Sequence, residues 1–138
     1  MNPILRNILA VVAAFVLGGA MNMGLILLGS AALPPPPGVD VNDPVSINAH
    51  IREYSALQLV VPFLAHALGT LVSAFVAARF STTRKMAFAM AFGVLGLLGG
   101  VMAVRMIPDA PLWFVLLDLI VAYLPMAWWG GLLAMPGK

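Results

Sequence analysis

Residues 61–79 read VPFLAHALGTLVSAFVAAR, and this stretch decides the class of fold. It contains no acidic residue, and its one strongly basic residue is the final Arg79. A helix needs about 20 apolar residues to cross the hydrocarbon core of a bilayer. With its flanks, the stretch predicts a membrane span over residues 56–80. It also places an ionisable side chain, His66, inside that span, where polar groups are costly unless they have a partner.

The composition of the whole chain agrees with a membrane protein. Of the 138 residues, 62% are hydrophobic and 9% are charged. Soluble domains are about 45–50% apolar and about 25% charged. The seven Lys and Arg residues are scattered along the chain, so no basic patch predicts a nucleic-acid partner. The chain has no cysteine, which excludes disulfides and thiolate chemistry.

The pattern of apolar runs predicts an all-α membrane protein with a single domain over residues 1–138. Transmembrane helices are expected at residues 4–29, 56–80, 86–107 and 112–135, arranged as two hairpins of the same orientation. Residues 33–55 form an outer loop that opens with four prolines, and residues 46–58 have the spacing of a short interfacial helix. The first apolar run is longer than the core of a signal peptide, so we expect a span there.

The distribution of basic residues predicts the orientation in the membrane. Arg52 and Arg105 fall near one side, and the other basic residues fall on the opposite side: Arg6, Arg79, Arg84, Lys85 and Lys138. The positive-inside rule therefore predicts that both termini are cytoplasmic, in a membrane such as the bacterial inner membrane.

Small residues mark the faces on which the helices are expected to pack. Close backbone approach drives helix association in lipid, and glycine permits it. The candidate packing residues are Gly18, Gly69, Gly93, Gly96 and Gly100. The same faces are compatible with a homo-oligomer or with packing inside a larger membrane complex.

A set of polar side chains inside the spans forms the candidate ligand- or ion-binding site. Its members are Asn22, His66, Thr70, Arg105 and Asp118. At 1.5 Å per residue, Asp118 lies roughly 9 Å and His66 roughly 13 Å below the outer boundary. A purely structural interpretation pairs Arg105 with Asp118 and uses Asn22 and Thr70 to link helices. A functional interpretation makes Asp118 a proton- or cation-binding carboxylate, with His66 as its relay partner.

Cofactor and enzyme motifs are lacking in the sequence. A haem would need a second histidine at the depth of His66, and His50 falls in the outer loop. His50 and Glu53 lack a third ligand for zinc. We therefore predict no cofactor and no metal site, and no catalytic residue is assigned. Tyr123 and Pro125 predict a kink in the fourth span.

Two functions remain open on this basis. The first is a binding or transport module whose polar site, in the outer half of the bundle, takes a small solute, an ion or a lipid. The second is a structural or accessory subunit, in which the polar side chains hold helices together. An enzyme acting on a lipid or quinone, with His66 and Asp118 as acid and base, has no supporting motif.

Overall fold

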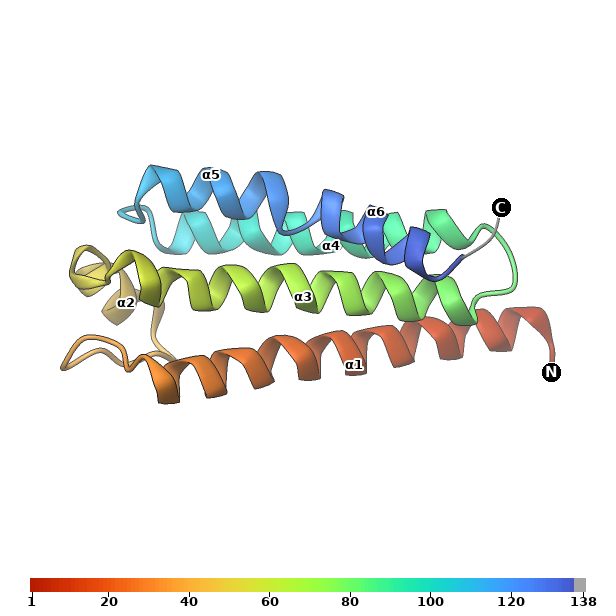
Figure 1. Cartoon of the computed structure of the whole chain (residues 1–138), viewed down its shortest axis with the longest axis horizontal. Coiled ribbons are helices and arrows are strands. Elements are labelled where there is room, and N and C mark those ends of the chain that lie inside the picture. The colour runs from red at the N-terminus through yellow and green to blue at the C-terminus, as the bar shows by residue number, and fades with distance from the viewer. Residues whose placement is uncertain (136–138) are drawn as a thin grey trace.

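A computed structural model describes residues 1–135 of the chain, and in this range every regular element is helical (Figure 1). The elements are, in chain order, α1 (Pro3–Ala32), α2 (Pro44–His50), the short 3-10 helix η1 (Ile51–Glu53), α3 (Ala56–Phe80), α4 (Lys85–Met106), α5 (Leu112–Val121) and α6 (Leu124–Leu133). The helices α1, α3, α4 and the pair α5–α6 are long and apolar enough to cross a membrane. The predicted all-α membrane bundle is thus confirmed.

Local sequence signals explain where the long helices begin and end. Asn2 caps α1, because its Oδ1 accepts a hydrogen bond of 2.8 Å from the Ile4 amide. The helix ends at Ala32, just before the prolines at 34–37, which cannot donate to a helical ladder. Ser55 and Gln58 form a reciprocal capping box that starts α3. This cap separates α3 from α2 and η1, so the helix predicted over residues 46–58 is interrupted at Tyr54 and Ser55.

The fourth span is broken into α5 and α6 at Ala122 and Tyr123. Tyr123 has φ −114° and ψ −79°, and Pro125 follows it within the first turn of α6. Proline has no amide hydrogen and clashes with the carbonyl four residues earlier, so a regular helix cannot continue through this point. The kink expected from Tyr123 and Pro125 is present as a full break, and Tyr123 is buried there.

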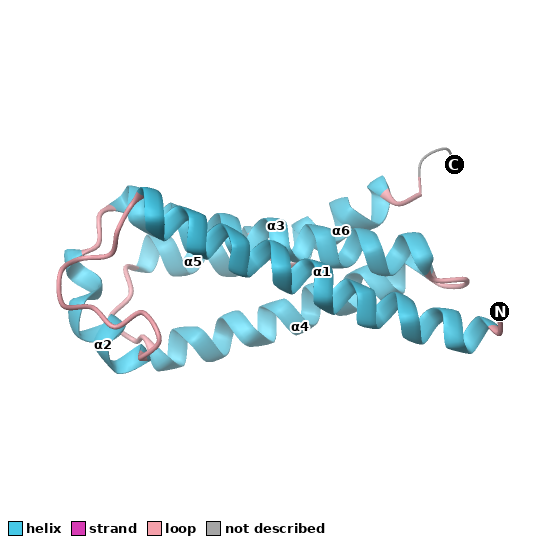
Figure 2. Ribbon diagram, turned by 90° about the horizontal axis from the view of Figure 1, so that it is seen from below, coloured by secondary structure: helices cyan, strands magenta, loops and turns pink. Residues whose placement is uncertain are grey.

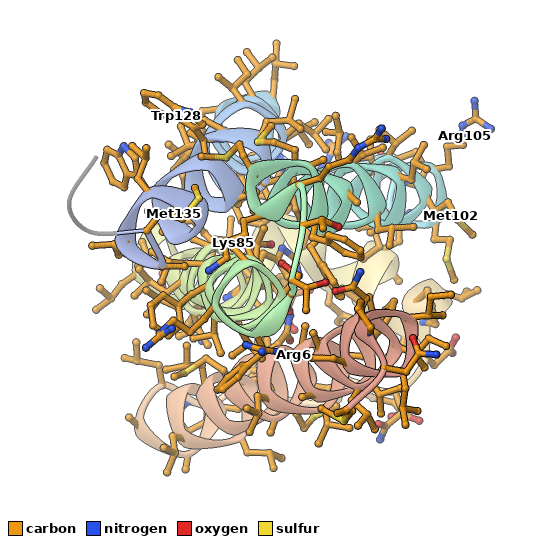
Figure 3. The ribbon with its side chains drawn as sticks, turned by 90° about the vertical axis from the view of Figure 1, so that its right-hand side faces the viewer. Arg6, Lys85, Met102, Arg105, Trp128 and Met135 are labelled. Atoms are coloured by element: carbon orange, nitrogen blue, oxygen red, sulfur yellow. The ribbon has the colours of Figure 1, made fainter. Side chains whose placement is uncertain are left out.

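The helix α3 lies at the centre of the bundle. It packs against α1 on one side and against α4, α5 and α6 on the other (Figure 1, Figure 3). The N terminus, the α3–α4 turn and the end of α6 share one end of the bundle, called here the terminal end (Figure 1). The loop of residues 33–55 covers the opposite end, called here the lid end.

Charges and exposed apolar side chains are distributed as in a membrane-embedded bundle. Arg6, Arg79, Arg84 and Lys85 lie at the terminal end, while Lys138 is outside the described residues. The outward faces of the long helices carry large apolar side chains, among them Leu28, Leu98, Ile120 and Leu133. Because so much apolar surface would be unfavourable in water, the surroundings of these faces are lipid.

The terminal half of the bundle is packed through small residues. Ala74, Ala78, Ala89 and Ala127 are completely buried and contact one another across α3, α4 and α6. Gly130 lets α6 approach α3 so closely that a Cβ there would lie 2.5 Å from the Leu71 carbonyl oxygen. Because alanine and glycine have small side chains or none, the helices can approach closely. Such close backbone contact stabilises helix bundles in lipid.

The lid end is closed by a segment called here the lid, residues 44–54. Asn48 exchanges two hydrogen bonds of 3.0 Å with Asp109 in the α4–α5 turn. Arg52 lies 3.6 Å from the same carboxylate. Ile51 is 4% exposed and turns inward, toward the interior of the bundle. The lid is therefore amphipathic: its polar side is fastened to the α4–α5 turn, and its apolar side covers the bundle.

Candidate functional site

Three side chains meet inside the lid half of the bundle and form what we call the polar cluster: His66, Asp118 and Tyr123. His66 Nδ1 lies 2.9 Å from Asp118 Oδ1. The Tyr123 hydroxyl donates a hydrogen bond of 2.8 Å to Asp118 Oδ2 and lies 3.2 Å from His66 Nδ1. Asp118 and Tyr123 are 5% and 4% exposed, so both oxygens of a deeply buried carboxylate have partners.

The break in the fourth span brings Tyr123 to this cluster. In an uninterrupted helix, side chains five residues apart point about 140° away from each other. The irregular backbone at Ala122 and Tyr123 changes that relation, so the Tyr123 hydroxyl reaches back to Asp118. The ring lies against α4, where a Cβ at either Gly96 or Gly100 would come within 2.7 Å of it. These two glycines therefore make the space that the tyrosine occupies.

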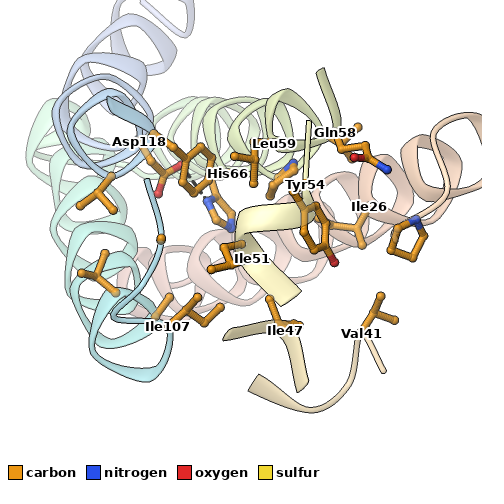
Figure 4. A pocket seen from close by; sticks show the side chains of 18 of the residues that line it. Ile26, Val41, Ile47, Ile51, Tyr54, Gln58, Leu59, His66, Ile107 and Asp118 are labelled. Atoms are coloured by element: carbon orange, nitrogen blue, oxygen red, sulfur yellow. Dashed lines mark hydrogen bonds and ion pairs between the residues drawn. The ribbon is translucent and has the colours of Figure 1, made fainter. Parts of the chain in front are cut away.

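The hydrogen-bond pattern decides which nitrogen of His66 remains free. The single hydroxyl hydrogen of Tyr123 goes to Asp118, so the Asp118–His66 contact places a hydrogen on Nδ1 when the carboxylate is ionised. Nε2 makes no hydrogen bond within residues 1–135. The ring lies between Asp118 and Ile51 of the lid, facing the space beneath the lid (Figure 4). Nε2 is thus the ring nitrogen of the cluster that is free to make a further hydrogen bond.

A cavity of about 280 Å³, called here the lid cavity, lies between the lid and the polar cluster. Its walls are mainly apolar, and His66 and Asp118 are at its inner end (Figure 4). Tyr54 lies on the lid side, where burial raises the pKa of its hydroxyl, so the residue stays neutral. The wall residues are Ile26, Ser30, Leu33, Pro35, Val41, Ile47, Ile51, Tyr54, Gln58, Leu59, Val61, Pro62, Gly100, Ala103, Val104, Ile107, Ala110, Phe114 and Val115.

A second cavity of about 510 Å³, called here the lateral groove, lies between α1 and α4 beside α3. The two helices diverge toward the lid end (Figure 2). At the other end of the groove, the rings of Phe15 and Phe92 meet with centroids 4.9 Å apart. Gly19 and Gly99 line the groove, and a Cβ at either would meet nothing within 4 Å. His66, Gly100 and Ala103 line both cavities, so the two cavities are neighbours on either side of these residues, next to the polar cluster.

The structure places the other predicted site residues in different surroundings. Thr70 is buried in the wall of the lateral groove, and Asn22 is half-buried opposite it, on α1. Arg105 is exposed and points away from the bundle (Figure 3), so Asp118 is partnered by His66 and Tyr123 instead of an arginine.

The predicted packing glycines all lie at close helix contacts. A Cβ on Gly18 would overlap the Ser73 hydroxyl, one on Gly69 would meet Asn22, and one on Gly93 would meet Ala127. Ser73 itself donates a hydrogen bond of 3.1 Å to the Ala14 carbonyl across the α1–α3 contact.

Tyr123 is the member of the cluster that sequence reasoning did not assign to the site. The sequence marked it only as part of a kink. The useful signal was the combination of a buried aspartate, a tyrosine five residues later and a proline two residues after that. Such a proline breaks the helix where the tyrosine lies, and this break can turn the hydroxyl toward the aspartate.

The cluster has an unbalanced charge when it holds no extra proton. Within residues 1–135, the cavity walls contribute no Lys or Arg, and Arg52 pairs with Asp109 outside the cavity. In the same range, no three His, Cys, Asp or Glu side chains are grouped as they would be around a metal ion. An ionised Asp118 beside a neutral His66 therefore leaves one negative charge in an apolar surrounding, which favours uptake of a cation.

Comparison with known proteins adds no family or homologue: no protein-family model matches the chain, and no curated protein or solved structure is significantly similar to it. The chain is an all-α membrane bundle by its fold, and its site has to be interpreted from its own geometry.

Proposed function

We propose that the protein is a binding or transport module that takes a small amphipathic molecule into the lid half of the bundle. The observation that carries this proposal is that His66, a member of the polar cluster, lines two neighbouring cavities. Ligand sites are typically apolar cavities with a few converging polar groups. Here the apolar walls would hold a chain or ring, and His66 Nε2 would hold the polar head.

The surroundings of the cluster agree with a ligand that arrives from lipid. The lateral groove lies between two membrane-spanning helices and is flanked by apolar side chains such as Phe15 and Leu95, which are 56% and 49% exposed. A molecule with an apolar tail could move sideways from the bilayer into this groove. Its head would then reach His66 while the tail stayed among apolar side chains.

Photoaffinity labelling tests the proposal directly. The probe is decanol carrying a diazirine in its chain, added to the protein in lipid nanodiscs, with labelled residues identified by peptide mapping. We expect labels to concentrate on the cavity walls, for example at Leu59, Val104 and Phe114. Ala103→Phe should strongly reduce this labelling, because Ala103 lines both cavities and the larger ring would occupy their junction.

The matched control is Ala91→Phe on the same helix. Ala91 is exposed and lines neither cavity, so its substitution should leave the labelling pattern unchanged. Labelling that is spread evenly over the outer faces of the helices, and that is insensitive to Ala103→Phe, would refute a binding site in the bundle.

The alternative is a structural or accessory subunit, and one observation favours it. The polar cluster links α3 to the fourth span through hydrogen bonds, as a helix cross-link would. This function predicts that Asp118→Asn lowers the thermal unfolding midpoint, that no probe enters the cavities, and that the protein co-purifies with a larger membrane protein in mild detergent. Isolation as a stable, self-contained species would count against it.

A further inference from the structure

We propose that the ligand head is a protonated amine, which replaces a proton held by His66 and Asp118. This inference rests on the proposed function, because it names the class of molecule that the same site would take. The ligand class is therefore an amphipathic ammonium ion, with an apolar tail and at least one N–H group.

The first argument is the charge of the site. Asp118 is the only acidic residue that lines either cavity within the described part of the chain, and His66 is the only side chain there that can neutralise it. The remaining titratable groups that line the two cavities are the hydroxyls of Tyr123 and Tyr54, while the lining residues of α1 and α4 carry no titratable group. The buried pair is neutral with one added proton and negative without it.

The second argument is the direction of His66. Nδ1 is engaged by Asp118, so Nε2 faces the cavity as a lone-pair acceptor when the pair carries no added proton. An ammonium N–H can donate to this nitrogen and supplies the missing positive charge. When the pair is proton-loaded, Nε2 carries a hydrogen and the site is neutral, so it offers the ammonium neither an acceptor nor an attracting charge.

The third argument is the shape of the surroundings. The cluster lies between an apolar cavity under the lid and a groove open between α1 and α4, so space for an apolar tail is present on two sides. A small inorganic cation would need several ligands, and within residues 1–135 no three His, Cys, Asp or Glu side chains are grouped around the cluster. An organic ammonium needs only one acceptor and a nearby negative charge.

The exchange can be written as a balanced step. The proton-loaded pair releases one proton to water at the lid end, and one ammonium ion takes its place, so the charge of the site does not change. By linkage, the apparent affinity for the ammonium ion then rises with pH, by up to about tenfold per pH unit, until the unloaded form predominates.

The test compares two probes with the same chain, decylamine and decanol. Decylamine stays protonated at about pH 6 and about pH 8, because amines of this type titrate near 10.4. Binding to the protein in nanodiscs of neutral lipid is measured by calorimetry, with empty nanodiscs subtracted. Proton release is followed with a pH indicator in weak buffer. We expect decylamine to bind more tightly at the higher pH, and to release protons as it binds.

Two variants and the decanol result make the outcomes distinct. Asp118→Asn should abolish the preference for decylamine over decanol. His66→Gln keeps an acceptor but leaves the Asp118 carboxylate as the remaining proton site, so the pH dependence of decylamine binding should change from that of the unmodified protein. Decanol binding as tightly as decylamine, without proton release, would overturn this inference and leave the binding function standing. Failure of both probes to bind would overturn the binding function as well.

If Asp118→Asn does not fold, the His66→Gln variant and the proton release of the unmodified protein still decide the question. Binding of decylamine with no proton release and no pH dependence would contradict the exchange.

Discussion

Two places in the bundle, the α3–α6 contact and the open side of the lateral groove, use the same residue type for opposite purposes. In the terminal half, a neighbouring helix occupies the space beside a glycine. A Cβ on Gly130 would lie 2.5 Å from the Leu71 carbonyl oxygen and 3.0 Å from the Phe75 amide nitrogen. Beside the lateral groove, Gly19 and Gly99 face open space. A glycine-rich helix in lipid can therefore either bring backbones together or leave a passage between them, and only the neighbouring helix decides which occurs.

The largest expected effect is that of Gly130→Ala. The new methyl group would meet backbone atoms of α3, which cannot rotate away as a side chain can. Overpacking of this kind costs about 1–3 kcal/mol, and sometimes more. We expect a clear drop in the thermal unfolding midpoint of the purified protein. The matched control is Gly99→Ala, whose Cβ would meet nothing within 4 Å and which should leave the midpoint unchanged or raise it. Equal midpoints for the two variants would contradict the contrast between glycines at a close helix contact and glycines that face open space.

The next effect in size is that of Tyr123→Phe. This change keeps the ring against Gly96 and Gly100 but removes the hydrogen bond to Asp118. The strongest side-chain hydrogen bonds measured in membrane bundles are worth about 1.7 kcal/mol, so the unfolding midpoint should fall. The His66 ring signals in nuclear magnetic resonance spectra should shift as well, because its Nδ1 then has Asp118 as its sole partner. Unchanged His66 signals would show that the tyrosine hydroxyl is not part of the cluster.

A smaller effect is expected for Ser73→Ala. Its hydroxyl donates to the Ala14 carbonyl, which joins α1 to α3 on the floor of the lateral groove. Hydrogen bonds between membrane helices average about 0.6 kcal/mol. The unfolding midpoint should therefore fall slightly, and less than for Tyr123→Phe. A fall in the midpoint as large as that of Tyr123→Phe would mean that the α1–α3 contact contributes as much to stability as the hydrogen bond of Tyr123 does.

The smallest effects are expected in the lid. Arg52 and Asp109 are mostly exposed, and such ion pairs contribute about 0–1 kcal/mol, so Arg52→Ala should hardly change global stability. Asn48→Ala removes two hydrogen bonds to the same aspartate and should loosen the lid more. Hydrogen–deuterium exchange of the α2 amides measures this difference. Faster exchange in Arg52→Ala than in Asn48→Ala would reverse the proposed order.

Much of the architecture follows from the sequence because lipid imposes simple rules. The length of the apolar runs predicts the four spans, and counting residues along the spans predicts similar depths for His66 and Asp118. The partner of Asp118 was harder to predict. Arg105 follows Gly100, which faces Tyr123, by five residues, so a regular α4 turns its side chain about 140° away from the interior. Counting depth alone misses this rotation.

The direction of Tyr123 and the formation of the lid cavity could not be predicted by counting residues along the spans. The direction of Tyr123 depends on an irregular backbone at a helix break, which a periodic pattern does not describe. The lid cavity depends on contacts between segments far apart in the chain, such as those from Asn48 to Asp109. No local sequence pattern determines contacts of this kind.

The aromatic pair Phe15 and Phe92 has a consequence for sidedness. Because these rings join α1 and α4 at one end of the lateral groove, the groove lies on the lid side of the pair. If the proposed transport function is correct, a molecule that travels from the groove toward the terminal end has to pass these two rings, so their separation is the conformational change that such a function would require.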